Sequence, residues 1–261
     1  MKTPIVPVSR LTQAQRERMF ELMFMYYEKV TWDCFLQDLS EKSHVILLQD
    51  KNETLWGFST IVTQRQVLAG HKVIALFSGD TILHESYWGN GALASAFGRF
   101  LVRLKLLHPL TPIYYFLISK GYKTYLLIAK NFANYFPRWD RETPQDYLSI
   151  MDEFYGKRFG PQYDREHGLI LPKKDSAHLK SQVACIAPAF LANPEISFFQ
   201  KRNEKWAEGY ELACIAKVTL AVPIGYALKR FRKMLNRQLL QGSSVPKRQE
   251  RLSNQTQGIS S

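Results

Sequence analysis

Three ionisable side chains lie close together in the sequence, just before a turn that contains two glycines. Asp80, His84 and Glu85 carry carboxyl or imidazole groups, which are the groups that most often take a proton from a substrate. His84 has the intrinsic pKa that is closest to neutrality. For each residue the ordinary alternative is a solvated or hydrogen-bonded loop position. We therefore treat the three as candidate general bases.

The turn itself, Trp88-Gly89-Asn90-Gly91, has the composition of an anion site. Glycine lets the backbone approach a ligand closely. A helix that begins at such a turn adds unpaired N–H groups and the positive end of its dipole, which favour a phosphate. The alternative is a glycine turn that only joins a strand to a helix. The candidate donor-binding residues are Leu83, Trp88, Gly89, Asn90, Gly91 and Ala92.

The elements on either side of the turn must position these residues. Apolar side chains recur at helical spacing after the turn, which predicts an amphipathic helix from Leu93 to Leu107. Thr12 and Gln15 have capping-box spacing and predict the start of a helix over 11–30, and a shorter helix or turn is expected over 31–43. Apolar runs bounded by turn residues predict strands. These are 44–49, 55–67 with a bulge at Gly57, 73–77 continued at 81–84, and 113–118, which is followed by a helix over 122–132.

The character of the chain changes after Pro137. A helix is expected after Thr143-Pro144, and the patterns that follow are mixed, so we predict a mainly helical annex that packs on the first unit. The fold class predicted is α/β (α+β), with a mixed, mostly antiparallel sheet and helices on both faces. The expected organisation is a donor-binding core at 1–136, the annex at 137–218, a basic amphipathic helix at 219–240 and a disordered tail at 241–261.

The net charge of +12 is concentrated near the C-terminus, where residues 217–251 carry nine lysines or arginines and one acidic residue. In 219–240 the basic residues lie opposite an apolar stripe. Such a helix suits an anionic membrane surface. The alternative is a helix that docks its apolar face on the annex. Nucleic acid is not expected as a partner, because aromatic residues are not interleaved with the basic ones.

The number of cysteines and the distribution of apolar residues indicate the cellular compartment in which the protein is expected. The three cysteines are widely spaced and form no CxxC pair, so neither a disulfide framework nor a zinc site is expected. The N-terminus lacks the apolar core of a signal peptide, and no run of about 18 apolar residues is present. We expect a cytoplasmic protein, associated with a membrane if the basic helix binds one, and without a metal.

The order of elements, with the glycine turn opening the central helix, resembles the GCN5-related N-acetyltransferase (GNAT) superfamily over residues 10–136. In that family the strand ends in a segment like V-x-P-x-[YF]-[RQ]-G-x-G-[IV]-[GA], whose amides hold the pyrophosphate of an acyl-CoA. The segment LHESYWGNGAL is similar to it. A fainter resemblance of residues 25–48 is to the acyl-homoserine-lactone and N-acyl amino acid synthase branch.

The resemblance implies acyl-CoA or acetyl-CoA as co-substrate and an amine as acceptor. The sequence departs from the family pattern at two positions. Trp88 replaces the usual Arg or Gln, which removes a phosphate contact, and Leu93 replaces the second Gly or Ala, which crowds the helix start. An acyl-carrier-protein thioester is therefore an alternative donor. The family's acid, a tyrosine, falls near Ile128 by spacing. Tyr122 and Tyr125 lie one to two turns earlier and are the candidate acids, with aromatic core residues as the alternative.

Two functions compete at this point. The first is an N-acyltransferase that moves an acyl group from a thioester to an amine. The second is a catalytically inactive GNAT-shaped module that binds an acyl donor or tethers a partner at a membrane. The sequence has no G-x-S-x-G elbow, Walker loop or H-E-x-x-H motif, so hydrolase, nucleotide and zinc-protease chemistry are not expected.

Overall fold

A single mixed sheet forms the centre of the computed structural model, which describes residues 1–172, 178–179 and 188–221. The strands are ordered β1-β3-β4-β5-β6-β11-β9-β8, and β7 pairs with β11. All neighbours are antiparallel except β5 and β6, which are parallel. The predicted mixed, mostly antiparallel sheet is therefore confirmed. A parallel pair needs a crossover connection, and here the glycine turn and helix α3 supply it.

The N-terminal segment begins with a short edge strand, β1 (Ile5–Pro7), and then forms two helices, α1 (Gln13–Tyr26) and α2 (Trp32–Ser40). Thr12 and Gln15 make the predicted capping box at the start of α1. That helix is shorter than the expected range, because Tyr27–Glu28 leave it as β2 and pair with β10 (His178–Leu179).

The meander consists of β3 (His44–Gln49), β4 (Leu55–Leu68) and β5 (His71–Leu83). The register between β3 and β4 shifts at Trp56, directly beside Gly57. A Cβ at Gly57 would lie 2.8 Å from the carbonyl oxygen of Ile82, so glycine is needed there for close approach of β5.

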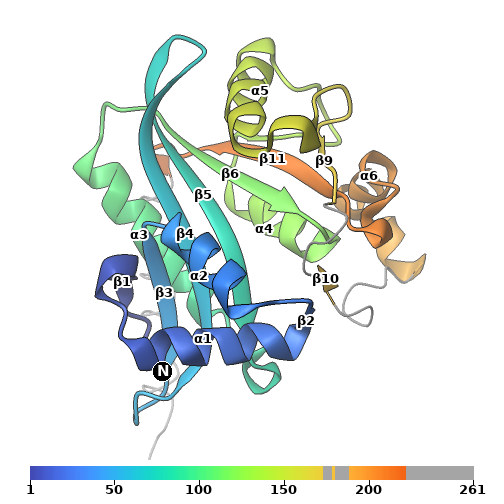
Figure 1. Cartoon of the computed structure of the whole chain (residues 1–261). Helices are drawn as coiled ribbons and strands as arrows, with labels where there is room; N and C mark the ends of the chain where they lie inside the picture. The colour runs from blue at the N-terminus through green and yellow to red at the C-terminus, as the bar shows by residue number, and fades with distance from the viewer. Residues whose placement is uncertain (173–177, 180–187, 222–261) are drawn as a thin grey trace, which may run out of the picture. The chain divides into compact units, whose positions relative to one another are not determined.

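The crossover after β5 begins with a short 3-10 helix, Glu85–Tyr87, and continues through α3 (Ala92–Leu107), β6 (Ile113–Ser119) and α4 (Tyr122–Asn131). These elements match their predicted ranges closely. Helices α3 and α4 bury their apolar faces on one side of the sheet, and α1, α2 and α5 cover the other side (Figure 1). Helices therefore lie on both faces, as predicted.

The annex is helical in α5 (Gln145–Phe159) and α6 (Pro194–Arg202), and it also completes the sheet. Strand β11 (Glu211–Lys217) pairs along the whole of β6. This strand was not predicted, because its residues between Glu211 and Lys217 are all apolar and show no period of two. The short elements of the annex are β7 (Tyr135–Phe136), β8 (Tyr163–Asp164), β9 (Leu169–Ile170), and 3-10 turns at Gly160–Gln162, Pro188–Ala192 and Trp206–Glu208.

The predicted basic helix at 219–240 and the tail at 241–261 lie outside the described residues, apart from 219–221. Both therefore stay predictions. In the part of the chain that the structure describes, no helix is long and apolar enough to cross a membrane.

Candidate functional site

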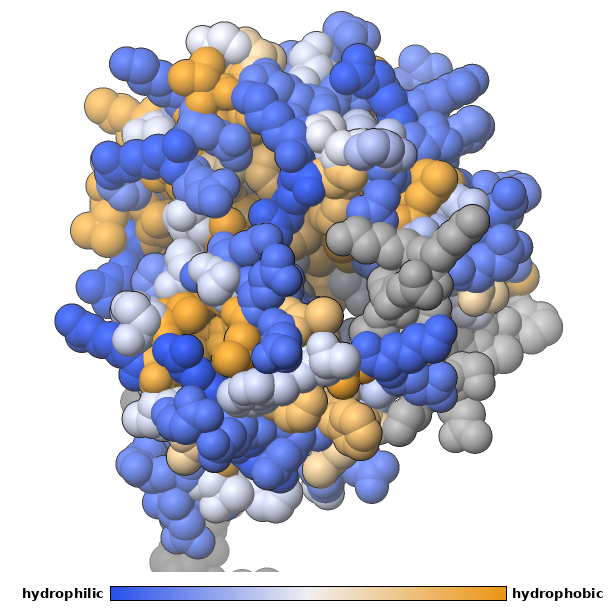
Figure 2. Space-filling view, viewed as in Figure 1, coloured by the Kyte–Doolittle hydropathy of each residue, from blue (hydrophilic) through white to orange (hydrophobic). Residues whose placement is uncertain are grey.

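The parallel strands β5 and β6 part at the middle of the sheet. Their pairing ends at Phe77 and Phe116, although β5 continues to Leu83 and β6 to Ser119. At the point of divergence the Ser78 hydroxyl lies 2.8 Å from that of Tyr115. Figure 1 shows the two strands diverging, and Figure 2, from the same side, shows a hollow near the middle of that face. Beyond Phe77 the edge of β5 that would face β6 has no partner strand in the described chain.

A bulge on β5 lies next to this fork. Ser59 pairs with Thr81 and Ile61 pairs with Ser78, so Gly79 and Asp80 together stand opposite Thr60 alone. A bulge redirects the side chains around it. A Cβ at Gly79 would lie 2.4 Å from the Thr60 hydroxyl, so this position has no space for a side chain.

Asp80 emerges from the bulge toward helix α2. Its carboxyl group is close enough to Asp38 and Lys42 for both to influence its pKa. Asp38 Oδ1 accepts a 2.6 Å hydrogen bond from Lys42 Nζ. The Lys42 side chain is only 3% exposed. Burial, followed by the Asp38 charge, raises the pKa of Asp80 to about 6, while Lys42 opposes the rise. A carboxyl group with that pKa is a base at neutral pH that can hold a proton when it receives one.

Other titratable groups surround Asp80 on the same side of the sheet. Burial raises the pKa of Glu211 at the start of β11, with a smaller contribution from Asp80 and an opposing one from Lys120. Lys120 Nζ lies 3.8 Å from Glu211 Oε1. Burial, and then the Asp80 charge, raises the pKa of the Tyr27 phenol. The region around the fork is therefore rich in carboxylates, which suits a cationic group such as an ammonium ion.

His84 and Glu85 are held at the turn. His84 Nδ1 accepts a 3.3 Å hydrogen bond from the Ser86 amide, and its ring packs edge-on against Trp56 with centroids 5.2 Å apart. Glu85 is exposed, and its amide donates to the Tyr26 hydroxyl at 3.0 Å. Of the three candidate bases, Asp80 alone lies in the bulge beside the fork.

The glycine turn has the geometry expected of an anion site. Gly89 and Gly91 have φ of +78° and +67°, and no atom lies within 4 Å of a Cβ built on either. The Ala92 amide is capped by Asn90 Oδ1 at 2.8 Å. Among the described residues, no hydrogen bond uses the amides of four positions around the helix start. These positions are Gly89, Gly91, Leu93 and Ala94.

Both departures from the GNAT pattern have a structural account. Trp88 is 57% exposed, and its indole N–H donates to the Leu83 carbonyl oxygen at 2.8 Å, so it supports the backbone at the turn. The Leu93 side chain is 7% exposed and packs in the core with α3. It therefore occupies the core and leaves the exposed turn clear, which differs from the crowding expected there.

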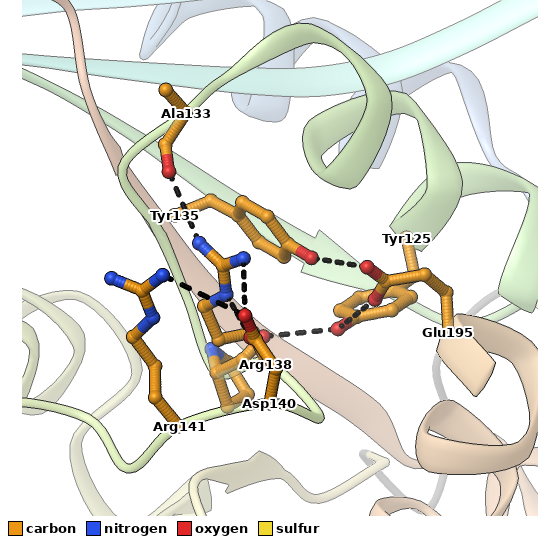
Figure 3. A network of polar contacts seen from close by, with 8 residues as sticks. Tyr125, Ala133, Tyr135, Arg138, Asp140, Arg141 and Glu195 are labelled. Carbon is orange, nitrogen blue, oxygen red and sulfur yellow. Dashed lines mark hydrogen bonds and ion pairs between the residues drawn. The ribbon is translucent and has the colours of Figure 1, made fainter.

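The two candidate acids differ in their surroundings, and Figure 3 shows those of Tyr125. The Tyr125 hydroxyl lies 3.0 Å from both the Pro137 carbonyl oxygen and Glu195 Oε2, and Tyr135 donates to the other oxygen of the same carboxylate. Burial raises the pKa of Tyr125. This network makes Tyr125 a structural link between α4 and α6. Tyr122 is buried, and its ring centroid lies 5.9 Å from that of Phe190.

Sequence reasoning missed three residues around Asp80, namely Asp38, Lys42 and Glu211. Asp38 and Lys42 have the i,i+4 spacing of a helical ion pair, but nothing in the local sequence indicates that they meet β5. Among the described residues, no group of three His, Cys, Asp or Glu side chains is arranged to hold a metal ion.

No protein-family model and no curated protein matches this sequence. Solved structures do match it, at low identity. A conserved protein from Enterococcus faecalis V583, described as a probable N-acyltransferase, matches 54% of this chain and 38% of its own, with 15% identity and a TM-score of 0.39. An acetyltransferase from Trypanosoma brucei matches 55% of this chain and 98% of its own, with 13% identity and a TM-score of 0.39.

A GNAT family N-acetyltransferase from Escherichia coli, in complex with CoA, matches 46% of this chain and 64% of its own, with 10% identity and a TM-score of 0.34. The described core contains the meander, the glycine turn, α3, the parallel strand β6 and α4, in the order predicted from the sequence. The chain spans 38% and 61% of the length of the first two structures that it matches.

Proposed function

We propose that the protein is an N-acyltransferase that moves an acyl group from an acyl-CoA or acyl-carrier-protein thioester to an amine. The observation that carries this proposal is the fork between β5 and β6, with Asp80 in the adjoining bulge. A fork exposes strand N–H and C=O groups that can pair with an extended thioester arm, as an added strand would. The free amides of the glycine turn favour the negatively charged end of such a donor.

The acceptor would approach from the side of the sheet that carries Asp80 and Glu211. An amine at neutral pH is mostly an ammonium ion and must lose a proton before it can attack. Asp80 supplies a carboxylate that takes this proton, so an N–H bond breaks and an O–H bond forms. The amine nitrogen then bonds to the thioester carbonyl carbon, and the carbon–sulfur bond breaks. The second N–H proton leaves the nitrogen, the sulfur takes up a proton, and an amide and a free thiol result.

The first test is acyl transfer by the purified full-length protein. Acetyl-CoA and longer acyl-CoA thioesters would be offered with a panel of primary amines, and thiol release would be followed together with the mass of the amide. Asp80→Asn should lower kcat/KM by about 10²- to 10⁴-fold, because it removes the proton acceptor. Asp33→Asn, an exposed carboxylate on the same side at the start of α2, is the matched control and should keep the wild-type rate. Full activity of Asp80→Asn would refute the assigned base.

A binding module without catalysis is the second candidate. Two observations favour it: Trp88 stands where the GNAT pattern has an Arg or Gln, and the Tyr125 hydroxyl is held by the Glu195 network. Calorimetry with CoA thioesters and with an acylated carrier protein separates the two candidates. Binding without turnover over the whole amine panel supports the module. Absence of binding to any thioester rejects both.

A further inference from the structure

An ion pair joins Asp38 of α2 to Lys42, which follows that helix, and it lies beside the β5 bulge. Lys42 Nζ donates to Asp38 Oδ1 at 2.6 Å, and Lys42 is as buried as a core residue, with 3% of its side chain exposed. Burial of a lysine costs free energy unless its charge is compensated, so such a lysine is seldom retained for packing alone. A Cβ at Gly79 would lie 3.6 Å from Lys42 Nζ, which locates the ammonium group beside the bulge backbone.

The second observation is a hydroxyl group without a partner. Thr60 is 2% exposed, and its Oγ1 is among the buried polar atoms of the described chain that have no hydrogen-bond partner. It lies in the gap that Gly79 leaves open. An unpaired buried hydroxyl normally indicates a place for a water molecule or another polar group.

The third observation concerns the two carboxyl groups. The negative charge of Asp38 lies close enough to raise the pKa of Asp80. Two neighbouring carboxyl groups can hydrogen-bond to each other only while one of them holds a proton, because an ionised carboxylate has no hydrogen to donate. Lys42 stands beside this pair and cancels one negative charge when the proton is absent.

From these contacts we propose that Lys42 and Asp38 are positioning residues that make Asp80 a reversible proton acceptor. Lys42 keeps Asp80 ionised before the reaction, and Asp38 shares the proton that Asp80 receives from the acceptor's ammonium group. The Thr60 hydroxyl binds a water molecule next to the same carboxyl groups. The role in turnover rests on the proposed acyl transfer, whereas the protonation of Asp80 can be measured without any substrate.

The charged and titratable groups that face Asp80 come from three elements. Helix α2 and the turn after it contribute Asp38 and Lys42. Strand β2 contributes the phenol of Tyr27, and β11 contributes Glu211, whose charge is partly offset by Lys120. Asp38 and Lys42 act on the pKa of Asp80 in opposite directions. Removing each in turn therefore gives opposite expected shifts, which a loss of structure would not produce.

The experiment is a ¹³C carboxyl NMR titration of Asp80 in the full-length protein, with Asp80→Asn used to assign the resonance. Lys42→Met should raise the midpoint by about one pH unit or more, because two carboxylates are left without a cation. Asp38→Asn should lower it by a similar amount. Lys42→Arg should restore most of the wild-type midpoint. Lys157→Met is the matched control, because Lys157 makes the same i,i+4 ion pair at 2.5 Å with Glu153 on an exposed face of α5, and it should leave the midpoint unchanged.

The pH profile of kcat/KM should follow the same shifts, with the acidic limb moved up in Lys42→Met and down in Asp38→Asn. If Lys42→Met does not fold, as judged by circular dichroism, the shift measured in Asp38→Asn alone tests the proposal. Half of the Asp38 side chain is exposed, so this substitution leaves the core intact. Midpoints that stay within a few tenths of a pH unit in Asp38→Asn, or that move in the same direction in both variants, overturn the proposal. If the Asp80 midpoint moves in opposite directions in the two variants but the protein shows no turnover, the roles of Lys42 and Asp38 are retained and the proposed acyl transfer is rejected.

Discussion

At the scale of single residues, Gly79 is the position where the smallest change should have the clearest effect. Gly79→Ala places a methyl group 2.4 Å from the Thr60 hydroxyl and 3.2 Å from Lys42 Cε, so the bulge or the lysine must shift. We expect a loss of about 1–3 kcal/mol in the free energy of unfolding, measured by urea denaturation. The matched control is Gly156→Ala in the middle of α5, where nothing lies within 4 Å of the added Cβ. It should be neutral or stabilising, by up to about 1 kcal/mol. Equal stability of the two variants would contradict the tight packing at the bulge.

Asp80 also makes stability depend on pH. Because its folded-state pKa of about 6 lies above the unfolded value of 3.8, the folded state binds more protons between those values, and stability falls as pH rises through this window. Asp80→Asn removes the buried charge. The variant should be more stable than the wild type at pH 8 by about 1–3 kcal/mol, and the difference should nearly vanish at pH 4. Denaturant titrations of both proteins at the two pH values measure this, and an Asn variant that is less stable at pH 8 would show that the Asp80 carboxylate is stabilised where it lies.

Several single residues could be identified from sequence and others could not. The glycines of the turn and the capping box at Thr12 act through their own backbone or through neighbours three residues away, so local patterns predict them. His84 was favoured over Asp80 because its intrinsic pKa is closer to neutrality. The raised pKa of Asp80 could not be predicted from its neighbours in the sequence, since it comes from burial and then from the charge of Asp38, about forty residues earlier in the chain.

At the scale of elements, Glu195 joins three of them. Its carboxylate, at the start of α6, accepts hydrogen bonds from Tyr125 of α4 and Tyr135 of β7 (Figure 3). Glu195→Ala removes the acceptor of the Tyr135 phenol and leaves the Tyr125 phenol with the Pro137 carbonyl oxygen alone, so it should lower the free energy of unfolding by about 2–4 kcal/mol. Glu195→Gln keeps one acceptor oxygen and should lose less. Glu208→Ala, on an exposed turn of the same annex, is the control. If the alanine and glutamine variants lose the same amount, the carboxylate is not the link between the elements.

Helices and the meander strands were predictable because their apolar periods are local, as in α3 and in β3 to β5. Strand β11 was not predictable, since the continuous apolar run of five residues from Leu212 to Ala216 does not tell a buried strand from a buried helix. The fork between β5 and β6 could not be predicted from the sequence. It depends on where two strands stop pairing, and this is decided by the bulge and by the residues packed around it.

At the scale of the whole molecule, the annex and the core share one sheet, so the predicted boundary at residue 136 should not separate two independently folding parts. Strand β11 pairs with β6 from Leu212 to Lys217, and the buried Tyr155 hydroxyl of α5 lies 3.0 Å from the Leu117 carbonyl oxygen and 2.6 Å from that of Cys214. A fragment of residues 1–136 would expose the β6 edge and the apolar face that α5 covers.

We therefore expect fragment 1–136 to show no cooperative thermal unfolding and to aggregate, whereas fragment 1–221 should unfold cooperatively within a few degrees of the full chain. Circular dichroism and calorimetry of the two fragments measure this, with sedimentation to detect aggregates. The 1–221 fragment ends after β11 and so keeps every strand of the described sheet. A 1–136 fragment that folds cooperatively would contradict this expectation. It would show that β6 needs no partner strand on the side where β11 pairs with it.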